Sequence, residues 1–308
     1  MLQERKPCPI CRADSVRSRV EVPIGFSRCH RCHTAYWVNS WSPAQATEYY
    51  HGYHTSDTLQ RDELTEHRYH VLLDQFQRLR AVGRLLDVGC GTGHFLTVAE
   101  ARGWDVVGLE VSQSALEWLG RLKRERGLRF AVIGTELTRS ALPPNHFDVV
   151  TLFEVIEHLD DPLATLREAY RVLVSGGLLY LTTPNYNSLS RHLLHSRWRV
   201  IAPEHRCLLN PLTLKSCLVD AEFRPLRMVT KNIDVPEILS KWGLRRQTQH
   251  PTRPDSSSQR LRHTVEAHAT LRVLKSGVNA FLKGSRLGDT IEVLVQKPHA
   301  IPRPNGTS

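Results

Sequence analysis

The stretch Leu85-Leu86-Asp87-Val88-Gly89-Cys90-Gly91-Thr92-Gly93 joins an apolar strand to a loop in which every second residue is glycine. Glycine lets the backbone turn sharply and approach a ligand closely, and a helix after such a loop presents unpaired N–H groups. His94 stands where a dinucleotide-binding loop has its last glycine. Asp87, just before the loop, would repel a diphosphate but attract an ammonium group. The stretch therefore predicts a ligand with an amino-acid end.

A second acidic residue, Glu110, ends the next expected strand, 21 residues after Gly89. A carboxylate at this place can accept hydrogen bonds from both hydroxyl groups of a ribose. Together with the glycine loop, Glu110 predicts a nucleoside that binds over the edge of a sheet.

Apolar strands and amphipathic helices alternate along the chain from Arg84 onward. The expected strands cover residues 85–88, 105–109, 128–133, 148–153, 178–182, 224–232 and 290–296. The expected helices cover residues 95–101, 114–123 and 212–221, and a further helix begins after the N-cap Asp161 and ends at Gly176-Gly177. This pattern predicts an α/β fold with a doubly wound, mostly parallel seven-stranded sheet of the Rossmann-like type, whose last strand pairs with the sixth.

Four of the seven cysteines are paired by their spacing, as Cys8-x2-Cys11 and Cys29-x2-Cys32. Two such pairs can supply the four thiolates of a closed tetrahedral zinc site, which is structural and not catalytic. Residues 18–22, between the pairs, alternate in polarity as a strand does. The sequence therefore predicts a zinc ribbon over residues 1–38.

The rest of the chain divides into three parts. Residues 39–83 are expected to form a helical lead-in, and residues 84–298 to form the α/β domain with an insertion at about 233–288. Within the insertion, residues 261–282 predict a basic helix that is a lid, a subunit contact or a membrane-surface element. Residues 299–308 are expected to be a disordered tail.

The net charge of +10 is unevenly distributed along the chain. Residues 1–33 hold seven Lys/Arg and three Asp/Glu, residues 241–308 hold twelve and four, and the remainder holds 22 and 24. Basic ends attract phosphate-bearing partners, but aromatic residues are not interleaved with them as on a nucleic-acid platform. No apolar run reaches the ~20 residues that cross a bilayer, and the first residues lack the apolar core of a signal peptide. We expect a cytoplasmic protein.

Six motifs, in this order and spacing, resemble those of class I S-adenosylmethionine-dependent methyltransferases. They are Asp-Val-Gly-Cys-Gly-Thr-Gly at 87–93, Gly-Leu-Glu at 108–110, Phe-Asp-Val-Val at 147–150, Glu-Val-Ile-Glu-His-Leu at 154–159, Arg-Val-Leu-x2-Gly-Gly at 171–177 and Thr-Pro-Asn at 183–185. The resemblance covers about 84–230 and the last strand. It points to the branch of ubiquinone-pathway O-methyltransferases and type 23 methyltransferases, and the layout resembles bacterial enzymes that carry an N-terminal zinc ribbon and modify sugars or surface glycans.

The resemblance implies which residues hold the cofactor. Asp87 and Gly89 would bind the methionine part of S-adenosylmethionine, Glu110 the ribose, and the segment with Glu136 would lie near the adenine. The full set of expected cofactor residues is Asp87, Gly89, Cys90, Gly91, Gly93, Glu110, Glu136 and Phe153.

A cluster of titratable residues follows the fourth strand. Glu154, Glu157 and His158 stand at positions i, i+3 and i+4, which share one face of a helix, and His205 follows the fifth strand. The two carboxylates and two imidazoles could hold a divalent ion, magnesium by resemblance to small-RNA 2′-O-methyltransferases, that would lower the pKa of an acceptor hydroxyl. Without a metal, His205 would act as general base. The expected catalytic residues are His205, Glu154 and His158.

The sequence thus predicts a methyltransferase that transfers a methyl group from S-adenosylmethionine to a hydroxyl of a small-molecule or glycan-linked acceptor. An RNA methyltransferase of the metal-assisted 2′-O type is an alternative, favoured by the basic ends and opposed by the near-neutral central domain. A non-catalytic module that binds S-adenosylmethionine is a second alternative. The sequence leaves the acceptor, the task of the ribbon and the oligomeric state open.

Overall fold

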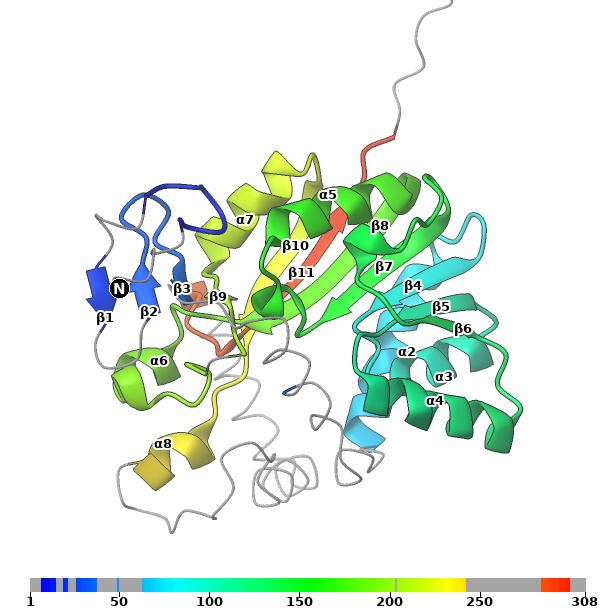
Figure 1. The fold of residues 1–308 in the computed structure, drawn as a ribbon, viewed down its shortest axis with the longest axis horizontal. Coiled ribbons are helices and arrows are strands. Elements are labelled where there is room, and N and C mark those ends of the chain that lie inside the picture. Colours follow the sequence, from blue (N-terminus) through cyan, green and yellow to red (C-terminus); the bar gives the residue numbers. More distant parts are fainter. Residues whose placement is uncertain are drawn as a thin grey trace, which may run out of the picture.

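The computed structural model describes residues 7–14, 19–21, 26–37, 49, 63–202, 204–241 and 284–299. Its centre is a seven-stranded sheet in the order β10-β11-β8-β7-β4-β5-β6 (Figure 1). The strands are β4 (Arg84–Val88), β5 (Asp105–Leu109), β6 (Ala131–Ile133), β7 (Phe147–Phe153), β8 (Leu173–Pro184), β10 (Arg224–Lys231) and β11 (Thr290–Gln296).

The pairing of the strands confirms the predicted mixed sheet. β4 pairs in parallel with β5 and β7, β5 with β6, and β7 with β8. β11 runs antiparallel to both β8 and β10, so the last strand pairs with the preceding one as expected and is also inserted beside β8. The chain order changes direction between β4 and β7, where ligands bind in folds of this type.

Helices cover both faces of this sheet (Figure 1). One face carries α5 (Pro162–Val172) and α7 (Pro211–Asp220), and the other carries α2 (Glu63–Gln77), α3 (His94–Ala101) and α4 (Gln113–Arg126). Neighbouring residues of one strand face opposite ways, so Leu86 joins the core under α5 and α7 while Leu85 joins the core under α2 and α3. Both leucines are fully buried, which stabilises the fold by about 2 kcal/mol each.

The start of α5 was predicted correctly and its end was not. Asp161 is the N-cap, its carboxylate accepts the N–H of Ala164, and Pro162 occupies the first turn. The helix ends at Val172, four residues before Gly176, and the glycine pair lies inside β8. Gly176 has a φ of 83° and donates its N–H to Lys297 O, while Gly177 accepts from Lys297 N. Pairing with the segment that follows β11 extends β8 through a sequence that locally resembles a helix stop.

A second, smaller sheet joins the N-terminal segment to the main domain. It has the order β1-β2-β3-β9, with β1 (Arg19–Glu21), β2 (Phe26–Arg28), β3 (Ala35–Trp37) and β9 (Cys207–Leu208). The outer strand β9 belongs to the α/β domain and pairs antiparallel with β3. The cysteine-bearing segment therefore packs on the domain as part of one sheet.

The predicted lead-in contains α2, and a single buried carboxylate shapes the turn after it. Asp148, at the start of β7, accepts the N–H groups of residues 81, 82, 83 and 84 at 2.5–3.2 Å. The predicted basic helix 261–282 and the tail from 300 onward lie outside the described residues. None of the helices in the described part is long and apolar enough to cross a membrane.

Candidate active site

The glycine loop connects β4 to α3 at the carboxyl edge of the sheet. Gly89, Gly91 and Gly93 have φ values of 71°, 54° and 74°, a region that other residues rarely adopt. A Cβ on Gly89 would lie 2.6 Å from Cγ2 of Val155, so glycine is required there for space as well as for conformation. Val155 lies between Glu154 and Ile156 on the segment after β7, so the loop and that segment are in contact.

Asp87 lies at the end of β4, immediately below the loop. The residue is only 2% exposed, and its Oδ1 accepts the hydroxyl of Thr151 at 2.6 Å. Burial raises the pKa of Asp87 to about 7, and the nearby charge of Glu110 adds to the effect. A cation that binds beside Asp87 would restore the charged form, as an ammonium group does.

Glu110, at the end of β5, ties the loop to the next segment. Its Oε2 accepts the N–H of Gly91, and its Oε1 accepts those of Val111 and Ser112, each at 2.8 Å. Each carboxylate oxygen has lone pairs beyond these bonds, so a diol can still be bound. The three main-chain donors fix the position of the carboxylate before any ligand arrives.

Aromatic rings surround Phe153, the last residue of β7. Its ring lies 4.9 Å from that of Phe95 and 5.6 Å from that of Tyr69, measured between centroids. Tyr69 comes from α2, and burial together with the charge of Asp87 raises its pKa. The sequence prediction missed Tyr69, whose one signal was its place three residues before Leu72 on the buried face of α2.

Two expected cofactor residues occupy other positions. Cys90 is buried under the loop, and its Sγ would lie 2.7 Å from a Cβ on Gly108, so its side chain packs in the core and only its backbone belongs to the loop. Glu136 is exposed before the 3₁₀ helix η3 (Leu137–Arg139), where its carboxylate lies 4.0 Å from Arg139. No contact joins Glu136 to Asp87 or Glu110 among the interactions of the described residues.

The expected helical face of Glu154, Glu157 and His158 is wrong. Glu154 has a φ of 53°, and only Ile156–His158 form a helix, the 3₁₀ turn η4. Glu154 is exposed and lies outside the group of potential ligand atoms that Glu157 forms with His158 and His205, although its charge still acts on Glu157. The potential ligand atoms of these last three residues all lie within 4.8 Å of one another.

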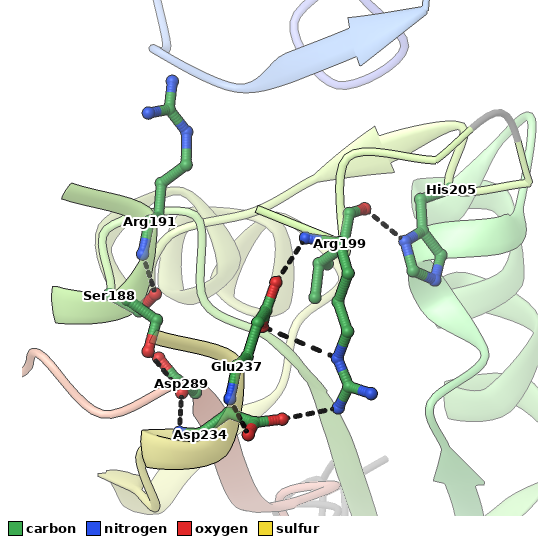
Figure 2. Close-up of polar contacts among 9 residues, drawn as sticks. Ser188, Arg191, Arg199, His205, Asp234, Glu237 and Asp289 are labelled. Atoms are coloured by element: carbon green, nitrogen blue, oxygen red, sulfur yellow. Dashed lines mark hydrogen bonds and ion pairs between the residues drawn. The ribbon is translucent and has the colours of Figure 1, made fainter. Parts of the chain in front are cut away.

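Main-chain carbonyls determine the tautomers of the two histidines. His158 Nδ1 lies 3.0 Å from Glu204 O, and His205 Nδ1 lies 2.6 Å from Val200 O, the contact drawn in Figure 2. A carbonyl only accepts, so each Nδ1 carries the proton and each Nε2 keeps its lone pair. The ring centroids are 4.8 Å apart. Burial lowers the pKa of His205 and lowers that of His158 to about 3, so both rings are neutral at neutral pH.

Glu157 lies beside these rings and is 1% exposed. Its Oε2 accepts the hydroxyl of Thr183 at 2.9 Å, whereas its Oε1 has no hydrogen-bond partner within the described part of the chain. Burial, followed by the charge of Glu154, raises the pKa of Glu157 well above its ordinary value. An unpartnered buried carboxyl oxygen beside two imidazole lone pairs fits a divalent cation, which supplies the missing charge.

The four paired cysteines also converge. Cys8 Sγ lies 3.5 Å from Cys32 Sγ, Cys11 Sγ lies 3.5 Å from Cys29 Sγ, and all four sulfurs lie within 4.8 Å of one another as free thiols. Zinc–sulfur bonds of 2.3 Å in a tetrahedron separate the sulfurs by about 3.8 Å, so the spacing fits zinc. The site is more than a surface feature, because Cys8 and Cys29 are fully buried.

A family model described as a methyltransferase domain matches residues 60–227. A probable S-adenosylmethionine-dependent methyltransferase of Mycobacterium tuberculosis (strain CDC 1551 / Oshkosh) is 35% identical over 156 residues, which are 50% of this chain and 54% of that protein. A ubiquinone biosynthesis O-methyltransferase of Pseudomonas putida (strain F1) is 34% identical over 115 residues, 36% of this chain and 49% of that protein. The chain thus spans about half the length of the curated relatives it matches.

Solved structures share the fold. A SAM-dependent methyltransferase from Archaeoglobus fulgidus is 20% identical with a TM-score of 0.50, and the match covers 76% of this chain and 94% of that one. The [4+2]-cyclase SpnF is 21% identical with a TM-score of 0.52, over 81% and 87% of the two chains. At these identities the likeness concerns the fold alone.

Proposed function

The chain belongs to the family of class I S-adenosylmethionine-dependent methyltransferase domains, and from this premise we propose that it methylates a hydroxyl oxygen of a small-molecule acceptor. The glycine loop and Glu110 would hold S-adenosylmethionine, and the acceptor would lie against Glu157, His158 and His205. The observation that carries the proposal is the pair of neutral imidazoles, whose lone pairs are kept available by two main-chain carbonyls beside the loop.

The cofactor half of the proposal rests on complementary chemistry. Asp87 would offer a buried carboxylate to the ammonium group of the methionine part, and the loop N–H groups would lie near the carboxylate end of that part. Glu110 offers lone pairs to the ribose diol from a carboxylate that three main-chain donors hold in place. Phe153 and Tyr69 would enclose the methionine part from the side of α2, which excludes water from the reacting centre.

His205 is proposed as the general base of the transfer. A neutral imidazole can take the proton from the acceptor hydroxyl as its oxygen attacks the methyl carbon and the carbon–sulfur bond breaks. The remaining requirement is alignment of the acceptor oxygen, the methyl carbon and the sulfur. Val155 contacts the loop at Gly89 and His158, which neighbours His205, follows three residues later, and this supports a base on the acceptor side of the loop.

Glu157, His158 and His205 would alternatively hold a divalent cation. Two imidazole nitrogens and one carboxylate suit zinc, iron or nickel better than magnesium, which prefers oxygen ligands. When bound, such an ion would lower the pKa of the acceptor hydroxyl. In both versions the same three side chains would line the acceptor side of the site, with the charge of Glu154 close enough to act on Glu157.

The acceptor class is proposed from the relatives and from charge. Relatives that match over the domain are named ubiquinone biosynthesis O-methyltransferases, whose names indicate a small acceptor. A sugar-linked hydroxyl presents the same chemistry to His205. Residues 34–240 hold 22 Lys/Arg and 24 Asp/Glu, a balance that does not favour an RNA acceptor.

The test is transfer of tritiated methyl from S-adenosylmethionine to fractions of a cell extract, with the wild-type chain and with His205→Ala. The proposal predicts label in a small or glycan-linked product that His205→Ala reduces about a hundredfold or more. Asn187→Ala, on the chain before α6 (Leu189–Leu194), is a matched control outside the site. Label in RNA would replace the proposal with the RNA alternative. A failure to bind S-adenosylmethionine in calorimetry would rule out methyl transfer altogether.

A further inference from the structure

Trp37, the last residue of β3, contacts the turn that carries His205. β3 pairs with β9, so that Ala35 lies opposite Leu208 and Tyr36 opposite Cys207. Extending this ladder by one residue places Trp37 next to Arg206 and His205. The cysteine-bearing segment thus reaches the proposed acceptor site through the pairing of β3 with the two-residue strand β9.

Two hydrogen bonds from Trp37 bracket His205 on both sides. The indole Nε1 donates to Ala202 O at 2.9 Å, and the main-chain N–H donates to Arg206 O at 3.1 Å. The carbonyl of Ala202 also accepts the N–H of His205 at 3.0 Å. Trp37 and the main chain of His205 therefore share one acceptor, the carbonyl of Ala202.

The cysteine module is itself attached firmly to the α/β domain. Thr213, in α7, donates its hydroxyl to Cys32 O at 2.9 Å, and Arg12 pairs with Asp161 at the N-cap of α5 at 2.5 Å. Cys29 N donates to Thr34 O, one residue before β3, so the second cysteine pair leads straight into the strand. These contacts transmit the position of the thiolate cluster to Trp37.

The other side of the same turn is anchored independently. Figure 2 shows Arg199 against Glu237 and Asp234 of the segment around α8 (Val235–Lys241). The main-chain N–H of Arg199 donates to Glu237 at 2.7 Å, and its guanidinium lies 2.8 Å from Asp234. If the hydrogen bond from Trp37 to Ala202 were lost, the contacts of Arg199 would still anchor the turn, so the turn would shift without unfolding.

We propose that the cysteine module positions the acceptor side of the active site, with Trp37 as the positioning residue that sets His205 against His158. The turn also supplies Glu204 O to His158 Nδ1 and Val200 O to His205 Nδ1, so its displacement alters both imidazoles together. The inference rests on the proposed role of His205, and it assigns the module a task within the chain that needs no second protein.

The test compares Trp37→Phe with Trp104→Phe in the full-length protein. Phenylalanine at 37 keeps the ring contact with Phe26, whose centroid is 4.7 Å away, and loses the indole N–H. Trp104 is a matched control, because its buried Nε1 has no hydrogen-bond partner within the described residues. Trp37→Phe is expected to lower kcat about tenfold and leave the KM for S-adenosylmethionine unchanged, whereas Trp104→Phe changes neither.

Two further measurements distinguish a positioning role of Trp37 from a general loss of structure. In a double-mutant cycle, adding Trp37→Phe to His205→Ala is expected to change kcat less than about twofold, since the effect of Trp37 passes through His205. In the ¹⁵N spectrum of histidine-labelled protein, Trp37→Phe is expected to shift the His205 ring signals, and Trp104→Phe is not.

The possible failures are distinguishable. If His205→Ala is as active as the wild type, the proposed base is wrong. If His205→Ala is inactive while Trp37→Phe matches Trp104→Phe in kcat and in the ring signals, the positioning role alone is overturned. Additive losses in the double-mutant cycle would also overturn it, because Trp37 would then act by another route.

Discussion

Replacing Gly89 with alanine should destabilise the protein through two separable effects. At a φ of 71° a side chain costs about 1–2 kcal/mol, because the left-handed region brings Cβ against the backbone. The new Cβ would also lie 2.6 Å from Val155 Cγ2, closer than real contacts allow. Overpacking of this kind adds about 1–3 kcal/mol. The expected loss in free energy of unfolding is therefore roughly 2–5 kcal/mol.

Gly127 offers a matched control for the conformational effect. It closes α4 with a φ of 65°, and a Cβ there would meet nothing within 4 Å. Gly127→Ala should lose only the conformational part, about 1–2 kcal/mol. The difference between the two variants measures the contact with Val155. Adding Val155→Ala to Gly89→Ala should remove most of that difference, after the loss of Val155→Ala alone is subtracted.

Urea unfolding of the full chain measures these free energies, and calorimetry measures the affinity for S-adenosylmethionine. Gly89→Ala should weaken binding, because the loop must move away from Val155, and Gly127→Ala should leave binding unchanged. Equal losses of stability in the two glycine variants, or no recovery on adding Val155→Ala, would refute the steric reasoning.

Four further outcomes are expected, two of them at Asp87. Affinity for S-adenosylmethionine should fall about tenfold per unit below pH 7, because burial raises the pKa of Asp87 to about 7 and protonation removes its charge. Without cofactor, the same raised pKa makes the free energy of unfolding decrease as pH rises from 3.8 to about 7, since the folded state binds the proton more tightly. An Asp87→Asn variant with unchanged pH dependence in calorimetry would contradict both statements. Asp148→Asn should lower the free energy of unfolding by about 2–4 kcal/mol in urea, since its carboxylate accepts four successive N–H groups; a loss below about 1 kcal/mol would argue against this turn. Elemental analysis should find about one zinc per wild-type chain and a clear deficit in Cys8→Ser, and a full equivalent in the variant would exclude the four-thiolate site.

Local signals predicted the parts of the site that lie on one segment. Asp87 lies in β4, the three glycines follow it directly, and Glu110 comes just after β5, so strand periodicity and glycine spacing were enough to predict their places in the fold. The same reasoning failed at Glu154, where an assumed helix placed it beside Glu157. Glu154 instead adopts a positive φ and the next residue, Val155, packs against the glycine loop, a contact between segments that no local pattern expresses.

Tyr69 and Glu136 illustrate what local sequence patterns do not reveal about the site. Tyr69 was missed because a tyrosine on the buried face of a helix resembles any core residue until the helix is placed against Asp87. Glu136 was expected near the adenine from the order of motifs; it is exposed after β6, 4.0 Å from Arg139, and its role stays a prediction. Glycines 176 and 177 resemble a helix stop, and the segment after β11 makes them part of a strand.

Residues close together in the chain were enough to predict the α/β fold, the glycine loop after β4 and the pairing of the cysteines. Only the tertiary structure decided which titratable groups meet. His158 follows β7 and His205 follows β8, yet their rings lie side by side. Trp37, from the N-terminal segment, donates a hydrogen bond to the turn that carries His205. Contacts between distant segments depend on how helices and strands pack, and the residues that meet in this way carry no periodic sequence pattern that would predict the contact.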